Sequence, residues 1–185
     1  MNQRLFIALL PPDTIQDEVR QIQYDLRDRY NTQATLKSPP HITLIPPFEL
    51  SSDRLEPLQI ELEKFAKTRS PFTINLSGFA AFPPRVIYLN VLPNPILQNL
   101  YVDIAATLAN NLDIHYPHAS RPFVPHMTVG FRDLTPENFE LAWAEFRDHQ
   151  INFDFEAIEL TLLEHDEKKW NVLSKFTLQS LEGSL

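Results

Sequence analysis

The order of apolar and polar residues in the first half of the chain predicts strands that alternate with helices. An uninterrupted apolar run is typical of a buried strand, and apolar residues three and four positions apart are typical of a helix. These patterns predict, in order, a strand over 4–10, a helix capped by Asp13 or Thr14 that runs to about residue 30, a strand that opens at 41 and is closed by residues 46–48, a helix from a cap at 51–53 to about 67, and a strand over 72–76.

The second half of the chain repeats this order. It predicts a strand over 86–91, a helix over 94–112, a strand from 126 to about 131, a helix with Thr135 as its cap and Pro136 as its first residue, a strand over 153–163 and a last strand over 170–178. A repeat at half the chain length indicates a duplication, with approximate units 1–80 and 81–165 and a C-terminal strand within 168–178. We therefore expect one α+β domain over 1–185, with sheets flanked by helices.

One five-residue pattern occurs in each half. Residues 40–44 read Pro-His-Ile-Thr-Leu and residues 125–129 read Pro-His-Met-Thr-Val, which places the two histidines 85 positions apart (126 − 41). Because alternate residues of a strand share a face, each copy predicts a strand with His and Thr on one face and aliphatic residues on the other. The spacing predicts two similar lobes whose shared cleft holds His41, Thr43, His126 and Thr128.

Composition narrows the classes of function. The 185 residues carry a net charge of −8 and show no cluster of Lys and Arg, so an extended nucleic-acid surface is not expected. A nucleic-acid substrate would then be a terminus or a small nucleotide. Three glycines and no cysteine leave no Gly-rich phosphate loop, no disulfide and no cysteine-based zinc site. The apolar run near the N-terminus is too short for a signal peptide or a membrane span, so we expect a cytoplasmic protein without membrane contact, and a monomer.

The paired motifs resemble those of the 2H phosphoesterase superfamily, which includes bacterial 2′–5′ RNA ligase and RNA cyclic phosphodiesterase proteins and is defined by two His-x-Ser/Thr-x motifs in one chain. The resemblance covers essentially the whole chain. It implies two pseudo-symmetric lobes of antiparallel sheet flanked by helices, with a central cleft that carries both motifs. It also implies hydrolysis of a 2′,3′-cyclic phosphate or a 2′–5′ phosphodiester without a metal or other cofactor, and 2′–5′ ligation by reversal.

Two imidazoles suit this chemistry because histidine titrates near neutral pH. One would deprotonate water and the other would protonate the leaving ribose oxygen, from opposite sides of phosphorus. The hydroxyls of Thr43 and Thr128 would donate to the non-bridging oxygens, where negative charge gathers. The resemblance suggests that His126 activates water and that His41 protonates the 3′ oxygen, which leaves a 2′-phosphate.

Four further residues near the motifs are possible substrate contacts. Phe48, Tyr88 and Phe131 offer aromatic surface for a base or ribose. Many family members carry Arg five residues after the second motif histidine, whereas this chain has Phe131 there and the arginine one position later, at Arg132. A shift of one residue along a strand reverses the facing, so Arg132 would reach the phosphate only where the strand has ended.

Three other hypotheses fit the same residues. The first is a related enzyme for another cyclic phosphate, such as that of ADP-ribose, which a substrate panel would separate. The second is a module that binds a nucleotide or an RNA end without turnover. The third is a metallohydrolase that uses His41, His126 and acidic partners, against which the absence of an H-E-x-x-H motif argues.

Overall fold

The computed structural model describes residues 2–116 and 121–179. The strands are β1 (Asn2–Leu9), β2 (Ile42–Ser51), β3 (Phe72–Phe82), β4 (Val86–Val91), β5 (His126–Gly130), β6 (Asn152–Ala157), β7 (Glu159–His165) and β8 (Trp170–Thr177). The helices are α1 (Asp13–Tyr30), α2 (Leu55–Ala66), α3 (Pro95–Leu112) and α4 (Pro136–Phe146), with 3-10 turns η1 (Ala34–Lys37) and η2 (Ser52–Arg54).

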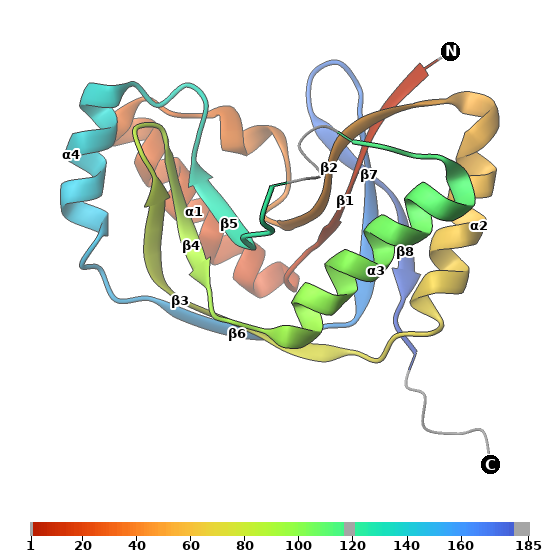
Figure 1. Cartoon of the computed structure of the whole chain (residues 1–185). Helices are drawn as coiled ribbons and strands as arrows, with labels where there is room; N and C mark the ends of the chain where they lie inside the picture. Colours follow the sequence, from red (N-terminus) through yellow and green to blue (C-terminus); the bar gives the residue numbers. More distant parts are fainter. Residues whose placement is uncertain (1, 117–120, 180–185) are drawn as a thin grey trace.

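All eight strands form one antiparallel sheet in the order β6-β3-β4-β5-β2-β1-β7-β8. The sheet is curled, and Figure 1 shows α1 and α4 beside one half of it and α2 and α3 beside the other. The expected α+β class with antiparallel strands flanked by helices is therefore confirmed.

Each half of the sheet takes its strands from distant parts of the sequence. The half β6-β3-β4-β5 packs with α1, which follows β1 in the chain, whereas β1 itself lies in the half β2-β1-β7-β8. Likewise α2 contacts β7 and β8, near the end of the chain. The division into duplicated units 1–80 and 81–165 stays a prediction.

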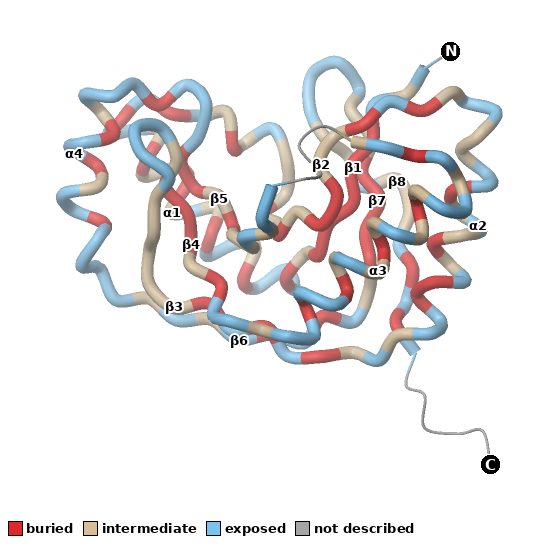
Figure 2. The backbone as a smooth tube through the Cα atoms, in the orientation of Figure 1, coloured by how far each residue is buried: buried red, intermediate tan, exposed pale blue. Residues whose placement is uncertain are grey.

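The main core lies between the sheet and the helices. Figure 2 shows buried residues along the central strands and the inner sides of the helices. On β1, Leu5, Ile7 and Leu9 belong to this core, while Phe6 and Ala8 belong to a smaller cluster with Leu163. Because neighbouring residues of a strand face opposite ways, this smaller cluster marks the other face of the sheet, which we call the open face.

Several boundaries differ from those that the pattern predicts. The single strand expected over 153–163 is two strands, with exposed Ile158 between them, because β6 pairs with β3 in one half of the sheet and β7 pairs with β1 in the other. Strand β2 does not close at residues 46–48 but continues to Ser51, paired with β1 through register shifts. A regular alternation pattern contains no information about such a change of partner.

The predicted helix caps are partly confirmed. Thr135 accepts a hydrogen bond from the backbone of Asn138 and Pro136 is the first residue of α4, as expected. Helix α1 begins at Asp13, but its N-cap is Pro12, and neither Asp13 nor Thr14 caps it. Among the described residues, no helix is long and apolar enough to cross a membrane.

Candidate active site

The two motif strands lie side by side at the middle of the sheet. They are joined by a single residue pair, Ile42 opposite Met127, in the part of the chain that the structure describes. Both side chains are fully buried in the main core. The residues on either side of them in sequence must therefore face the other way, toward the open face. The pairing of Thr43 with Ala8, which lies on the open face, agrees with this placement.

The direction of this pair fixes how the four motif residues stand relative to one another. In an antiparallel pair, one step forward on β2 corresponds to one step back on β5. Thr43 is thus alongside His126, and His41 is alongside Thr128. Each threonine stands next to the histidine of the other motif, in an arrangement that is twofold about the Ile42–Met127 pair. All four residues are half-buried.

Both histidine rings are held in the same way. Nδ1 of His41 is 2.7 Å from the carbonyl oxygen of Pro39, and Nδ1 of His126 is 2.7 Å from that of Val124. A carbonyl only accepts hydrogen bonds, so each Nδ1 carries the proton and donates it. In the neutral imidazole the lone pair is then on Nε2. Neither Nε2 has a hydrogen-bond partner among the described residues, which leaves both free for a substrate.

The surroundings favour the neutral form of both rings. Burial lowers the pKa of His41 to about 4, against the opposing effect of the Pro39 carbonyl, and the charges of His126 and Arg20 lower it further. Burial also lowers the pKa of His126, again opposed by its bond to Val124. An anionic phosphate bound beside the two rings would favour their protonated forms and so raise both pKa values.

Aromatic side chains adjoin each histidine. The Phe6 ring is 4.9 Å from that of His41 and packs edge-on against Trp170 at 4.6 Å. On the other side, Phe82 and Tyr88 lie 5.2 Å and 5.1 Å from the ring of His126. Phe82 is 39% exposed and Trp170 is half-buried, so both retain accessible ring surface. The sequence prediction missed Phe6, Phe82 and Trp170 because they reach the motifs only through strand pairing.

The other predicted contacts fall in different places. Phe48 is 4% exposed in the main core and does not line the site, since it is paired with Leu5 of β1, which also faces the main core. Tyr88 is beside His126 but only 6% exposed. Strand β5 ends at Gly130, so Phe131 and Arg132 lie in the following turn, with the guanidinium 5.1 Å from the centre of the Phe131 ring.

The sequence prediction also missed two polar residues of α1. Gln23 is 1% exposed and donates to the carbonyl of Thr128 at 3.1 Å. Arg20 donates to Gln23 and to the carbonyl of Ser38, each at 2.8 Å. The available signal was a glutamine at a core position of α1, four residues after buried Val19.

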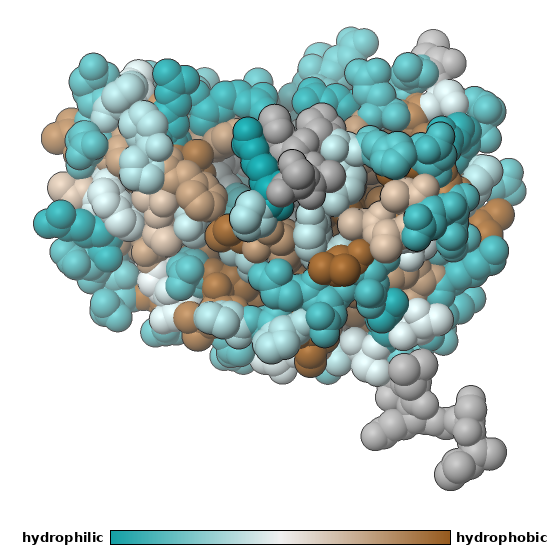
Figure 3. Space-filling model, viewed as in Figure 1, coloured by the Kyte–Doolittle hydropathy of each residue, from teal (hydrophilic) through white to brown (hydrophobic). Residues whose placement is uncertain are grey.

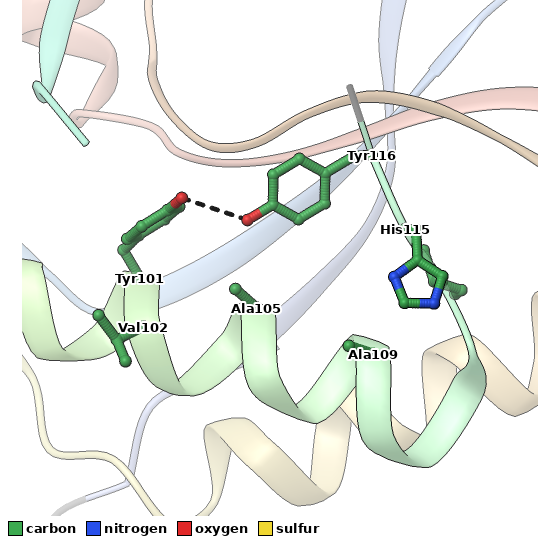
Figure 4. A pocket seen from close by; sticks show the side chains of 7 residues that line it. Tyr101, Val102, Ala105, Ala109, His115 and Tyr116 are labelled. Carbon is green, nitrogen blue, oxygen red and sulfur yellow. Dashed lines mark hydrogen bonds between the residues drawn. The ribbon is translucent and has the colours of Figure 1, made fainter. Parts of the chain in front are cut away.

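Two pockets lie away from the histidines. One, of about 260 Å³, is lined by residues of α3 and by Ile114, His115 and Tyr116, whose hydroxyl donates to Tyr101 at 3.3 Å (Figure 4). The other, of about 250 Å³, lies around Arg69 and Ile96. Within residues 2–116 and 121–179, no three side chains of His, Asp or Glu are grouped as metal ligands. The outline of the molecule dips between its two halves in Figure 3.

Fold and site together define a class: an α+β protein with two His-x-Thr motifs on adjacent central strands. The profile of the 2′-5′ RNA ligase superfamily matches residues 11–169. The chain belongs to this superfamily, which confirms the expected enzyme of the 2H phosphoesterase type.

Known proteins agree with this assignment over nearly the full length. A protein of Staphylococcus haemolyticus, named as a candidate phosphoesterase, is 32% identical over 93% of this chain and 97% of its own. Another so named, from Geobacillus kaustophilus, is 30% identical over 95% and 96%. Among solved structures, a protein of Thermus thermophilus gives a TM-score of 0.75 at 21% identity, covering 97% of this chain and 100% of its own. E. coli LigT complexed with 3′-AMP gives 0.71 at 20% identity over 97% and 100%.

Proposed function

We propose that this protein is a metal-independent phosphodiesterase. It opens a 2′,3′-cyclic phosphate to the 2′-phosphate, or cleaves a 2′–5′ phosphodiester, at an RNA end or on a small nucleotide. One observation carries the proposal: two histidines on adjacent strands, each with Nδ1 anchored to a carbonyl and Nε2 free. We further propose that it works as a monomer in the cytoplasm.

The proton transfers follow from the free Nε2 atoms. A neutral imidazole takes a proton from water at Nε2 as the oxygen attacks phosphorus. The other imidazole, protonated, gives its Nε2 proton to the ribose oxygen as the P–O bond breaks. The two rings exchange protonation states in one turnover, and exchange with solvent restores them. By reversal, the same groups would join a cyclic phosphate end to a 5′-hydroxyl without ATP.

Thr43 and Thr128 stabilise the transition state in this scheme. Each stands beside the opposite histidine, so a phosphate between the two Nε2 atoms would have one hydroxyl on either side. A hydroxyl donates one hydrogen bond, and the non-bridging oxygens carry the charge that grows during attack. Two donors related by the same twofold arrangement suit two equivalent oxygens.

The division of roles between the histidines is open to a direct test. The resemblance implies His126 as the base, whereas the electrostatics of the site favour His41. Arg20 lowers the pKa of His41 and is not a cause of the lowered pKa at His126. A base must be neutral before the reaction, and the less basic ring meets that condition more readily.

The aromatic rings favour a nucleoside next to the phosphate. Stacking of a base on an aromatic side chain contributes about 1–3 kcal/mol. Phe82 beside His126 and Trp170 beside Phe6 supply such surfaces on the two sides of the motif pair. LigT of E. coli, which shares the fold, has been solved with 3′-AMP and with ATP, and this supports a nucleotide ligand for the present protein.

Phe131 and Arg132 stay proposed contacts at the end of β5. The condition for Arg132 to turn toward the phosphate is that the strand has ended, and it ends at Gly130. Arg132 has a left-handed backbone, with φ of 60°, so the chain changes direction at this residue.

The test is hydrolysis of the four 2′,3′-cyclic nucleotides in EDTA, with 2′- and 3′-phosphate products resolved. Wild type should turn over, and His41→Ala and His126→Ala should each lose about 100- to 10,000-fold in kcat, the usual contribution of a general acid or base. His115→Ala, an exposed histidine outside the motifs, is the matched control. A folded wild type that binds nucleotides without hydrolysing them would instead support the binding module.

A further inference from the structure

Helix α1 holds both motifs through one polar connection. Arg20 Nη1 donates to Gln23 Oε1 at 2.8 Å, and Arg20 Nη2 donates to the carbonyl of Ser38, also at 2.8 Å. Gln23 Nε2 in turn donates to the carbonyl of Thr128 at 3.1 Å. We call these two side chains the Arg20–Gln23 link.

One end of the link leads directly to His41. Ser38 is followed by Pro39, whose carbonyl accepts the hydrogen bond from His41 Nδ1. The position of the Ser38–Pro39 segment therefore sets the orientation of the His41 ring. Arg20 fixes this segment by a charge-assisted bond, the stronger kind of hydrogen bond.

The other end leads to the second motif. Thr128 is itself a motif residue and is two positions after His126. Its carbonyl is fixed by Gln23, which is 1% exposed and is held in place by Arg20. Since β2 and β5 share one residue pair in the described chain, the backbone ladder alone gives little control over the distance between the motifs.

We propose that Arg20 and Gln23 are positioning residues that set the separation and orientation of His41 and His126. The inference rests on the proposed function, because it concerns the geometry of the two reacting imidazoles. Neither side chain is required to touch the substrate. Misplacement of reacting groups by about 1 Å can cost about 100-fold in rate, so a link of this kind affects kcat rather than KM.

Arg20 has a second, electrostatic effect in this arrangement. The charged or titratable groups that act on His41 are Arg20 and His126, and the Phe6 ring packs against the imidazole. The cation of Arg20 disfavours the imidazolium form of His41. Removal of this cation should therefore raise the pKa of His41 and leave that of His126 nearly unchanged.

Three variants separate the positioning effect of the link from the electrostatic effect of Arg20. Gln23→Leu keeps the side-chain size but removes the bonds to Arg20 and Thr128. Arg20→Lys keeps the charge but not the planar fork that reaches two acceptors. Arg20→Met removes both the charge and the planar fork. Arg27→Met is the matched control, since Arg27 is on the same helix with its guanidinium at the surface beside Asp28.

The experiment combines cyclic-nucleotide kinetics with NMR titration of the two imidazoles, and thermal unfolding identifies variants that are not folded. We expect kcat to fall by about tenfold or more in Gln23→Leu, Arg20→Lys and Arg20→Met, with KM within about twofold of wild type. The His41 pKa should rise in Arg20→Met and stay near the wild-type value in Arg20→Lys.

The outcomes distinguish this inference from the proposed function. Folded variants with wild-type kcat and an unchanged His41 pKa would overturn the inference and reduce the link to a structural contact. If wild type shows no turnover, the proposed function fails. The positioning role, which rests on that function, then fails with it, and the NMR titration tests only the electrostatic effect of Arg20: a rise in the His41 pKa in Arg20→Met alone supports that effect and no change overturns it.

Discussion

Ile42 and Met127 stand opposite each other as the one residue pair between β2 and β5 in the described chain, and both are fully buried. This pair places each motif threonine beside the histidine of the other motif. It also makes the middle of the sheet the place where its two halves are least tied by backbone hydrogen bonds. Side chains of the α1–η1 segment compensate for the few backbone bonds to β5. Thr35 donates a hydrogen bond to the carbonyl of Val129, and Gln23 donates one to the carbonyl of Thr128.

The motif hydroxyls give the first prediction. Thr43→Val and Thr128→Val keep the side-chain shape and strand propensity but remove a donor to the non-bridging oxygens. Loss of one such donor typically costs about 100- to 1,000-fold in kcat. We expect each variant to fall in this range with a smaller change in KM, as measured by steady-state hydrolysis of a cyclic nucleotide.

Thr73→Val is the control for this comparison, because Thr73 is an exposed threonine on β3, away from the motifs. Equal activity in Thr43→Val, Thr128→Val and Thr73→Val would show that the motif hydroxyls do not stabilise the transition state.

The roles of the two histidines give the second prediction. A p-nitrophenyl phosphodiester has a leaving group that departs without protonation, so it needs a general base but no general acid. If His41 is the base, His126→Ala should keep most of its activity on this substrate, while His41→Ala should not. The reverse pattern would assign His126 as the base, in agreement with the resemblance. Equal losses in both variants would contradict a division into one acid and one base.

The sequence predicted the two motifs and their facing because strand alternation is a local property. Ile42 and Met127 are buried and the flanking His and Thr residues are half-buried, as a period of two requires. The rule does not extend to Phe48, because β2 pairs with β1 through register shifts between Thr43 and Phe48. The change of strand partner at Ile158 could not be predicted in this way, because pairing depends on residues far along the chain.

The surroundings of the site were less predictable for the same reason. Phe6 meets His41 only because β1 is the neighbour of β2 in the sheet, and Trp170 of β8 reaches Phe6 across β7. Gln23 belongs to an otherwise apolar stripe, where a polar residue signals a buried hydrogen bond but not the identity of its acceptor.

The lowered pKa of His41 gives the third prediction, for stability against pH. Its pKa is lowered from 6.5 to about 4 in the folded protein, so the unfolded chain binds more protons between these values. Its contribution is therefore fully present above pH 6.5 and decreases as the pH falls toward 4. The depression corresponds to about 3 kcal/mol at most, and less in practice because the ring is half-buried.

Urea unfolding at pH 7.5 and pH 4.5 checks this prediction. Carboxylates also titrate in this range, so the comparison is between wild type and His41→Asn. Wild type should lose more free energy of unfolding than the variant on going to pH 4.5. An equal loss in both proteins would mean that the His41 pKa is close to its ordinary value.

The aromatic surfaces beside the histidines give the fourth prediction. Phe82→Ala removes ring surface next to His126, and Trp170→Ala removes ring surface next to Phe6, the ring that packs on His41; neither variant removes a group from the chemical step. A stacked base contributes about 1–3 kcal/mol, so KM for a cyclic nucleotide should rise by about 5- to 150-fold for whichever ring carries the base, with kcat changed less.

Tyr24→Ala, which changes a partly exposed aromatic residue on α1, is the control and should behave as wild type. The pattern identifies the side on which the base binds: a rise in Phe82→Ala alone places it beside His126, and a rise in Trp170→Ala alone places it on the side of His41, against Trp170 and Phe6. A substrate with bases on both sides of the phosphate should respond to both variants, and KM values unchanged in both would contradict stacking at either surface.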